Sequence, residues 1–264
     1  MKLGFIGCGN MASALIEGIL KNGLLLPEEI AAADLNTEAL RRSAEKFGIK
    51  TFASNIEIAE AADYLLLAVK PQFYENVISE IRENFPEKSV IISIAAGKTL
   101  AWLEKKFGRR IRAVRAMPNT PALVGEGMTG LCCGGPVSRS ELDFVKSLFS
   151  ACGKAEELPE SLIDTVTAVS GSSPAYVFIF IEAMADAAVA GGMPRAQAYT
   201  FAAQAVLGSA KMLLETGRHP AELKDMVCSP AGATIAAVRV LEEKGLRSAV
   251  FEAMEACRRR AGEL

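Results

Sequence analysis

Residues 4–12 are Gly4-Phe5-Ile6-Gly7-Cys8-Gly9-Asn10-Met11-Ala12, and this segment sets the interpretation of the amino-terminal half. It is an apolar run that leads directly into a G-x-G-x-x-A turn, after which a helical pattern begins. Strand, glycine turn and helix in that order are typical of a dinucleotide-binding βαβ unit. The first glycine permits the tight turn, and the second lets backbone amides approach a pyrophosphate. The sequence therefore predicts a cofactor site at Gly7, Cys8, Gly9, Asn10, Met11 and Ala12. The alternative is a tight turn that holds no ligand.

The first 150 or so residues continue this alternation. Segments such as 11–21 and 37–47 have apolar residues at three- and four-residue spacing, which predicts helices. Short apolar runs between such segments predict strands over 2–7, 30–34, 64–69, 89–94, 112–116 and 127–133. Strands that alternate with helices predict an α/β fold, a Rossmann-type doubly wound parallel sheet.

From about residue 160 the pattern changes to helices alone. They are predicted over 161–169, 174–189, 195–215, 221–227, 234–243 and 246–260. Several are apolar nearly all round, and about 100 residues offer too little interior to bury them. Burial against a second subunit would resolve this shortage. We therefore expect a dinucleotide-binding domain over 1–159 and an all-α domain over 160–264 that dimerises and holds substrate.

Composition narrows the function classes. The 29 basic and 31 acidic residues give a formal net charge of −2, so no strong positive field exists for nucleic acid. Residues 174–193 are nearly long enough to span a bilayer, but Glu182 and Asp186 lie mid-segment and would be costly there. Those two carboxylates are four residues apart on one helix face, where like charges repel mildly. We expect them to make polar contacts across a subunit interface, and the alternative is that they act as a catalytic acid/base pair. We expect no membrane and no nucleic-acid partner.

Cysteine and histidine usage speaks against metal sites. The six cysteines form no C-x-x-C pair, although Cys132 and Cys133 are adjacent on a predicted strand, and His219 is the one histidine. His219 precedes a proline and suits a surface or helix-capping role better than general-base work. The amino terminus lacks a signal-peptide pattern. These features predict no metal and reduced thiols in the cytoplasm.

Three loops after strands suit a cofactor crevice. Asp34 stands where a carboxylate commonly accepts hydrogen bonds from a ribose 2′-hydroxyl, which favours NAD(H) unless Asn36, Arg41 or Arg42 compensates a 2′-phosphate. Alternatively, Asp34 caps the following helix. A second loop contains Ala68, Val69, Lys70 and Pro71, where the proline forces Lys70 into an extended conformation. Lys70 is either over the crevice or an ordinary solvated lysine. The loop 117–121 either lines the same crevice or is a turn.

Two segments in the helical half resemble anion sites. Residues 170–174 (SGSSP) and 229–234 (SPAGAT) place small hydroxyl side chains just before predicted helices. Free backbone amides and the helix dipole at such positions suit a carboxylate, although each could equally be an ordinary cap. Together they indicate a small carboxylate substrate.

Several motifs resemble those of pyrroline-5-carboxylate reductases, in family order: GFIGCGNMA at 4–12, AVKPQ at 68–72, MPNTP at 117–121 and SGSSPAY at 170–176. LKDMVCSPAGATIAAVRVLE at 223–242 resembles the family signature nearly position for position. The resemblance spans essentially the whole chain. Two departures are Asp34, where many members have a small or hydroxyl residue, and Met226, where some have asparagine.

This resemblance implies reduction of the imine of 1-pyrroline-5-carboxylate to L-proline, the last step of proline biosynthesis, with NADP(H) or NAD(H). It also implies a homodimer or a higher oligomer of dimers. Residues 7–12, Asn55 and 68–71 match cofactor positions. Substrate positions match Ser229, Gly232, Ala233, Thr234 and, at the domain junction, Glu160.

The resemblance places Thr234 near the ring nitrogen, and we take it as the catalytic residue. A protonated iminium accepts hydride without a strong general acid, which suits a chain with no catalytic histidine constellation. Two rivals remain. A 3-hydroxyacid dehydrogenase would need a base such as Lys211 or Lys224, and a non-catalytic dinucleotide sensor would bind cofactor without turnover.

Overall fold

A computed structural model describes residues 1–263 and contains two compact units. The first comprises residues 1–172 together with residues 257–263, and the second is Ser173–Ala256. A helical stretch from Glu160 to Ala190 runs through the point at which the units divide. The predicted boundary between residues 159 and 160 stays a prediction.

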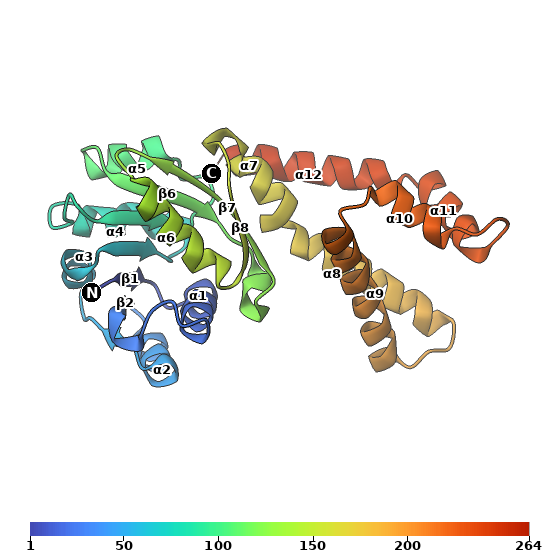
Figure 1. Ribbon diagram of the computed structural model, residues 1–264, viewed down its shortest axis with the longest axis horizontal. Coiled ribbons are helices and arrows are strands. Elements are labelled where there is room, and N and C mark those ends of the chain that lie inside the picture. Colours follow the sequence, from blue (N-terminus) through green and yellow to red (C-terminus); the bar gives the residue numbers. More distant parts are fainter. Residues whose placement is uncertain (264) are drawn as a thin grey trace. The chain divides into compact units, whose positions relative to one another are not determined.

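The first unit is built on one sheet with the strand order β3-β2-β1-β4-β5-β6-β7-β8 (Figure 1). From β1 the chain adds β2 and β3 on one side and β4 onward on the other, so the topological switch lies between β1 and β4. In open α/β sheets ligands bind at the carboxyl ends of the strands at this point. The strands are β1 Leu3–Ile6, β2 Ile30–Ala33, β3 Lys50–Thr51, β4 Tyr64–Leu67, β5 Val90–Ser93, β6 Arg112–Met117, β7 Gly127–Gly134 and β8 Gly153–Glu157.

Helices cover both faces of the sheet, which confirms the doubly wound prediction (Figure 1). One face packs against α1 (Asn10–Lys21), α2 (Thr37–Phe47) and α6 (Arg139–Ser150). The other packs against α3 (Asn55–Ala61), α4 (Tyr74–Ile81) and α5 (Leu100–Phe107). Because both faces are covered, all four residues of β1, β2, β4 and β5 are buried, which is why these strands are apolar runs in the sequence, with Ser93 at the end of β5 as the polar exception.

The all-parallel expectation is wrong at one pair, because β6 and β7 are antiparallel. Residues 118–126 join these two strands through a single 3-10 turn, Thr120–Val124. A parallel crossover needs a dozen residues or more, so this connection can only return the chain in the opposite direction. The antiparallel pairing joins residues 113–117 to residues 130–134 and carries the loop 117–121 past the carboxyl edge of the sheet.

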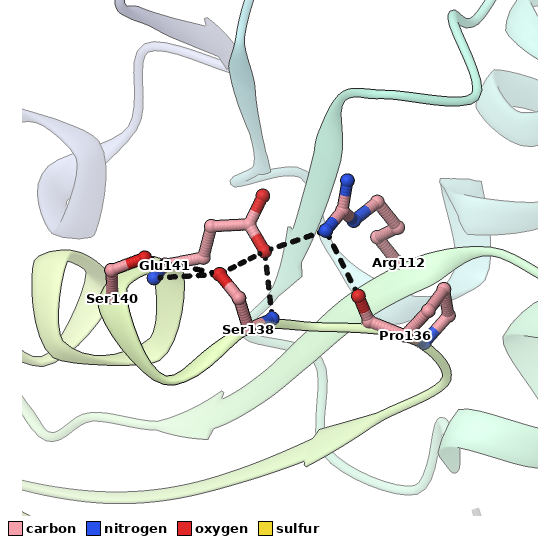
Figure 2. A network of polar contacts seen from close by, with 5 residues as sticks. All are labelled: Arg112, Pro136, Ser138, Ser140 and Glu141. Atoms are coloured by element: carbon pink, nitrogen blue, oxygen red, sulfur yellow. Dashed lines mark hydrogen bonds and ion pairs between the residues drawn. The ribbon is translucent and has the colours of Figure 1, made fainter.

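A polar network fixes the start of α6 to the amino end of β6 (Figure 2). Ser138 caps the helix and forms a capping box with Glu141, which also accepts from Arg112 Nη2 at 2.9 Å. The same Arg112 nitrogen donates to the carbonyl of Pro136 at 2.9 Å. Ser140 Oγ lies 3.1 Å from Ser138 Oγ. This network lies at the edge opposite the switch point, so we interpret it as structural.

The second unit contains helices only, as the sequence predicts. They are α8 Ser173–Ala190, α9 Arg195–Thr216, α10 Pro220–Val227, α11 Ala233–Glu243 and α12 Leu246–Gly262, the last of which ends in the first unit. The predicted helix 161–169 is present but divided into a 3-10 turn (Glu160–Leu162), α7 (Ile163–Val166) and a five-residue π turn (Thr167–Gly171). Within α8 and α9 only Ala185, Ala198 and Ala202 are buried in the single chain.

Candidate functional site

The glycine loop follows the carboxyl end of β1, at the switch point. The carboxyl ends of β2 and β4 lie on either side of it. Gly7 has φ +105°, and its N–H donates to the carbonyl of Ala33 at 2.8 Å. A Cβ on Gly7 would lie 2.8 Å from the carbonyl oxygen of Ala68 and 3.1 Å from the nitrogen of Val69. Both the backbone angle and this close approach exclude side chains. The strand end at β4 is therefore brought directly against the glycine loop.

Gly9 leaves the start of α1 open. It is the N-cap residue, with φ −73° and ψ −175°, and no side chain caps the helix. A Cβ on Gly9 would meet no protein atom within 4 Å. The first amides of a helix have no partner inside it, and together with the helix dipole they favour an anion. The loop therefore fits the pyrophosphate of a dinucleotide, with exposed Asn10 and half-buried Met11 at the opening and Ala12 buried beneath.

Asp34 is hydrogen-bonded to the glycine loop. Its Oδ2 accepts from the Cys8 amide at 2.6 Å, and its Oδ1 accepts from the Asn36 amide at 2.7 Å. The cap of α2 is Asn36, whose Oδ1 accepts from the Ala39 amide at 3.0 Å. The capping alternative for Asp34 is therefore wrong. Burial, with a smaller contribution from the Asp34 charge, raises the pKa of the Cys8 thiol to about 11, so this thiol is neutral at pH 7.

The loop after β4 reaches the same edge of the sheet. The Ala68 amide donates to the carbonyl of Ile6 at 2.8 Å, so the loop starts beside the glycine turn. Lys70 has φ −66° and ψ 150°, the extended conformation predicted for a residue before proline, and Pro71 begins a 3-10 turn. Lys70 is exposed, whereas Ala68, Val69 and Pro71 are half-buried.

Asn55 has a partner that the sequence does not indicate. It is the first residue of α3, and its Nδ2 donates to Glu80 Oε2 of α4 at 2.7 Å. The helix is capped by Ser54, whose Oγ accepts from the Ile56 amide at 3.1 Å. In the structure Asn55 therefore binds Glu80, and the contact of Asn55 with a cofactor stays a prediction.

Tyr74 is a residue of this edge that sequence reasoning missed. Its fully buried hydroxyl donates to the carbonyl of Leu67 at 2.6 Å and accepts from the Ile94 amide at 3.2 Å. Burial raises the pKa of this hydroxyl to about 12, so it stays protonated. One side chain therefore joins the carboxyl ends of β4 and β5. Nothing in the local apolar pattern distinguishes it from an ordinary core aromatic residue.

Tyr74→Phe is expected to lower the free energy of unfolding by about 1–3 kcal/mol, because the buried carbonyl of Leu67 and the half-buried amide of Ile94 lose their partner. Urea denaturation measures this change. Tyr64→Phe is the matched control, since Tyr64 is also buried but no hydrogen bond of its hydroxyl is found within residues 1–263. Equal losses in the two variants would contradict the role given to the Tyr74 hydroxyl.

Glu160 is held by two partners in the first unit. Its Oε1 accepts from the Leu100 amide at 2.7 Å, at the start of α5, and lies 3.2 Å from Nη1 of Arg115. Arg115 is 2% exposed, and its other terminal nitrogen lies 3.6 Å from Asp164. Glu160 thus compensates a buried cation, and its contact with substrate stays a prediction.

The segment 170–174 contains the end of a π turn and the start of α8 at Ser173, so the predicted helix start is confirmed, but the Ser172 amide is not free. The π turn Thr167–Gly171 continues the preceding helix, and the Ser172 amide donates to the carbonyl of Thr167 at 2.8 Å. Buried Asn119, from the loop 117–121, donates to the carbonyl of Ser170 at 3.0 Å and accepts from the Met128 amide at 2.9 Å. Asn119 therefore has a structural role.

The segment 229–234 is a helix start, as predicted. Gly232 caps α11 without a side-chain hydrogen bond, which leaves the first amides, including those of Ala233 and Thr234, directed out of the helix. The Gly232 amide donates to the carbonyl of Ser229 at 3.0 Å, and a Cβ on Gly232 would lie 2.3 Å from Ser229 Oγ. Ala231 has φ +57°, an unusual angle for a residue with a side chain. This turn closely joins Ser229 to the helix start.

Other predicted candidates have structural partners. His219 caps α10, and its Nδ1 accepts from the Ala221 amide at 3.2 Å, so the capping prediction is confirmed. Asp186 forms an ion pair with Arg195 of α9. Among residues 1–263, no group of three or more metal-binding side chains comes together.

Comparison with known proteins decides the family. A pyrroline-5-carboxylate reductase dimerisation model matches residues 160–264, and a model of coenzyme F420-dependent NADP oxidoreductases matches residues 2–97. The chain is 52% identical to the pyrroline-5-carboxylate reductase of Escherichia coli over 263 residues, covering 100% of this chain and 98% of that protein. This chain belongs to the pyrroline-5-carboxylate reductase family. The Methanosarcina acetivorans reductase is 46% identical over 263 residues, with 100% and 97% covered.

Solved reductases of this family have the same fold as this chain. The pyrroline-5-carboxylate reductase of Coxiella burnetii superposes with a TM-score of 0.93 at 37% identity, covering 99% of this chain and 97% of that one. The Plasmodium falciparum pyrroline carboxylate reductase, solved with NADP bound, gives 0.90 at 32% identity, covering 100% and 97%. The family is one of NAD(P)-dependent oxidoreductases, which agrees with the open glycine loop.

Proposed function

We propose that this chain reduces the ring imine of 1-pyrroline-5-carboxylate to L-proline with NAD(P)H, the last step of proline biosynthesis. The observation that carries the proposal is the glycine loop, with its uncapped helix start, in a chain that matches the E. coli reductase over its whole length. A bound NAD(P)H supplies the hydride. Residues 7–12 are proposed to hold the pyrophosphate, with Asp34, Asn55 and residues 68–71 as further cofactor contacts.

The start of α11 is the proposed substrate site. The amides of Ala233 and Thr234 together with the Ser229 hydroxyl suit the substrate carboxylate, because they are donors at the positive end of a helix dipole. Gly232 is proposed to line this site as the uncapped residue of the helix start, while its own amide donates to the carbonyl of Ser229. Thr234 is half-buried and is proposed to donate to the ring nitrogen or to order water there. Glu160 is proposed as a further substrate contact. The Leu100 amide and Arg115 both bind its Oε1, so Oε2 is the oxygen proposed to make this contact.

The chemistry needs few groups from the protein. The imine nitrogen is protonated before reaction, hydride adds to the adjacent carbon, and the nitrogen keeps its proton as the carbon–nitrogen double bond becomes single. No residue therefore has to accept a proton, in contrast to the oxidation of an alcohol. Lys211 and Lys224, the candidate bases of a hydroxyacid dehydrogenase, are ion-paired with Glu215 and Asp225. The Asp225 carboxylate raises the pKa of Lys224, the wrong direction for a base.

Oxidation of NADPH and of NADH, each with added 1-pyrroline-5-carboxylate, tests the proposal directly. Imine-dependent turnover with either cofactor is expected. Binding of a dinucleotide without any turnover would reject the reductase and favour the non-catalytic sensor. Turnover with a 3-hydroxyacid and no turnover with the imine would favour the dehydrogenase.

Thr234→Ala is expected to lower kcat by roughly tenfold to a hundredfold, because the hydrogen bond to the reacting ring is made most strongly in the transition state. Steady-state kinetics with saturating cofactor measure this effect. Thr200→Ala is the matched control, since the Thr200 hydroxyl donates to the carbonyl of Ala196 within α9. A Thr234→Ala variant with wild-type kinetics would remove this residue from the mechanism.

We also propose that the chain acts as a homodimer, or as a higher oligomer of dimers, in the cytoplasm. The stretch Glu160–Ala190 is long and apolar enough to cross a membrane by length and composition alone, and 6% of its most apolar window is buried in the single chain. The dimerisation model of the family begins at the same residue. We therefore assign this surface to a second subunit rather than to lipid, with the imine and proline as the small-molecule partners.

A further inference from the structure

The carboxylate of Asp34 lies at the predicted cofactor site as a fixed negative charge. It follows β2 directly, and β2 pairs with β1, so it lies beside the glycine loop. Each oxygen accepts one backbone amide, Oδ2 from Cys8 at 2.6 Å and Oδ1 from Asn36 at 2.7 Å. Two amides that hold the two oxygens fix the orientation of the carboxylate. They also bind it to the loop that is proposed to hold the pyrophosphate.

We propose that Asp34 makes this chain a reductase that prefers NADH to NADPH, an inference that rests on the proposed cofactor site. An ionised carboxylate has about four acceptor positions and no donor, and the two amides occupy half of them. The ribose of NADH offers two hydroxyl donors for the positions that remain. The 2′-phosphate of NADPH offers acceptors only and carries roughly 1.5–2 negative charges at pH 7. At Asp34, NADH therefore supplies hydroxyl donors for the free acceptor positions, whereas NADPH supplies a negative charge that the carboxylate repels.

Nearby cations offset this preference in part. Residues 34–42 contain two, Arg41 and Arg42 of α2. Arg41 Nη1 lies 2.6 Å from Glu45, and Arg42 Nη1 lies 3.3 Å from Glu38, so each arginine already has a carboxylate partner on its own helix. Both pairs are exposed and therefore weak, so an arginine can turn toward a phosphate at small cost. We accordingly expect a preference of roughly tenfold to a hundredfold rather than an absolute one.

Calorimetric titration of the full-length protein with NADH and with NADPH, without imine, tests the inference. The wild-type Kd for NADH is expected to be about tenfold to a hundredfold lower than that for NADPH. Asp34→Ser should remove or reverse this ratio, and Asp34→Asn, which keeps an acceptor for a loop amide, should do so with less risk to the loop. Asp63→Ser is the matched control, because Asp63 is exposed just before β4, at the opposite edge of the sheet.

A wild-type protein that binds NADPH as tightly as NADH, or more tightly, would overturn the inference. So would an unchanged ratio in both Asp34 variants. The values of kcat/KM for the two cofactors with imine give the second readout. Absence of turnover with an intact Kd ratio would reject the reductase function and leave the assignment of Asp34 standing. Turnover that favours NADPH, together with a lower Kd for NADPH than for NADH, would support the reductase function and overturn the assignment of Asp34.

Discussion

Gly9→Ala is expected to weaken dinucleotide binding by about a hundredfold while the free energy of unfolding stays within about 1 kcal/mol of the wild-type value. The backbone angles of Gly9 suit any residue, and the added methyl group would meet no protein atom within 4 Å. The protein therefore accepts the change. The same methyl group would stand over the amides at the start of α1, where the pyrophosphate has to approach. Calorimetric titration and urea denaturation measure the two quantities.

Gly7→Ala is the contrasting variant, two residues away. Its Cβ would lie 2.8 Å from the carbonyl oxygen of Ala68 at φ +105°, so both the fold and the site should suffer, with a loss of about 3 kcal/mol or more in the free energy of unfolding. The pair of variants separates damage to the cofactor surface from damage to the fold. Wild-type dinucleotide affinity in Gly9→Ala would show that the open helix start is not where the cofactor binds.

Ile179→Glu is expected to convert the proposed dimer to monomers, with an increase of at least roughly a thousandfold in the dimer Kd. Ile179 lies on α8 and is 66% exposed in the single chain, beside Phe178 at 65%. The folded monomer can therefore hold the carboxylate in water. In a two-fold symmetric dimer each copy would bury one unpaired charge, and each costs about 3–5 kcal/mol.

Sedimentation or light scattering over a range of concentrations reports the mass of this variant. Val124→Glu is the control, because Val124 is 78% exposed in the first unit and receives the same charge. A dimeric Ile179→Glu protein would place the subunit interface away from this face of α8.

The sequence predicts the sheet well where burial is complete. Strands β1, β2, β4 and β5 each have four buried residues in a row, and such runs are visible without any structure. The strand β3 is two exposed residues, and β8 (GKAEE) contains a single buried residue, Ala155, so neither has an apolar pattern to detect. The antiparallel direction of β7 could have been inferred from the nine residues that precede it. The π turn after α7 could not, because its residues suit a cap equally well.

The residues of the candidate site also fall into those that the sequence predicts and those that only the structure reveals. The glycine loop and the start of α11 are local features whose backbone geometry follows from neighbouring residues in the chain. The bonds of Asn55 to Glu80, Glu160 to Arg115 and Tyr74 to Ile94 join residues 20 to 45 apart, so they depend on packing that a single sequence does not encode locally. Asp34 illustrates both levels. Its position was predicted, and its partners, which exclude the capping alternative, required the structure.

The two outer strands of the sheet have a consequence for solubility. An exposed strand edge offers unpaired backbone groups to another chain, and proteins commonly protect it by shortness or charge. Here β3 ends the sheet on one side after two residues, and β8 ends it on the other with Lys154 and Glu156 in water. Neither edge is a good template for an additional strand. At high protein concentration we therefore expect the dinucleotide-binding unit to resist β-type aggregation and amyloid-like stacking.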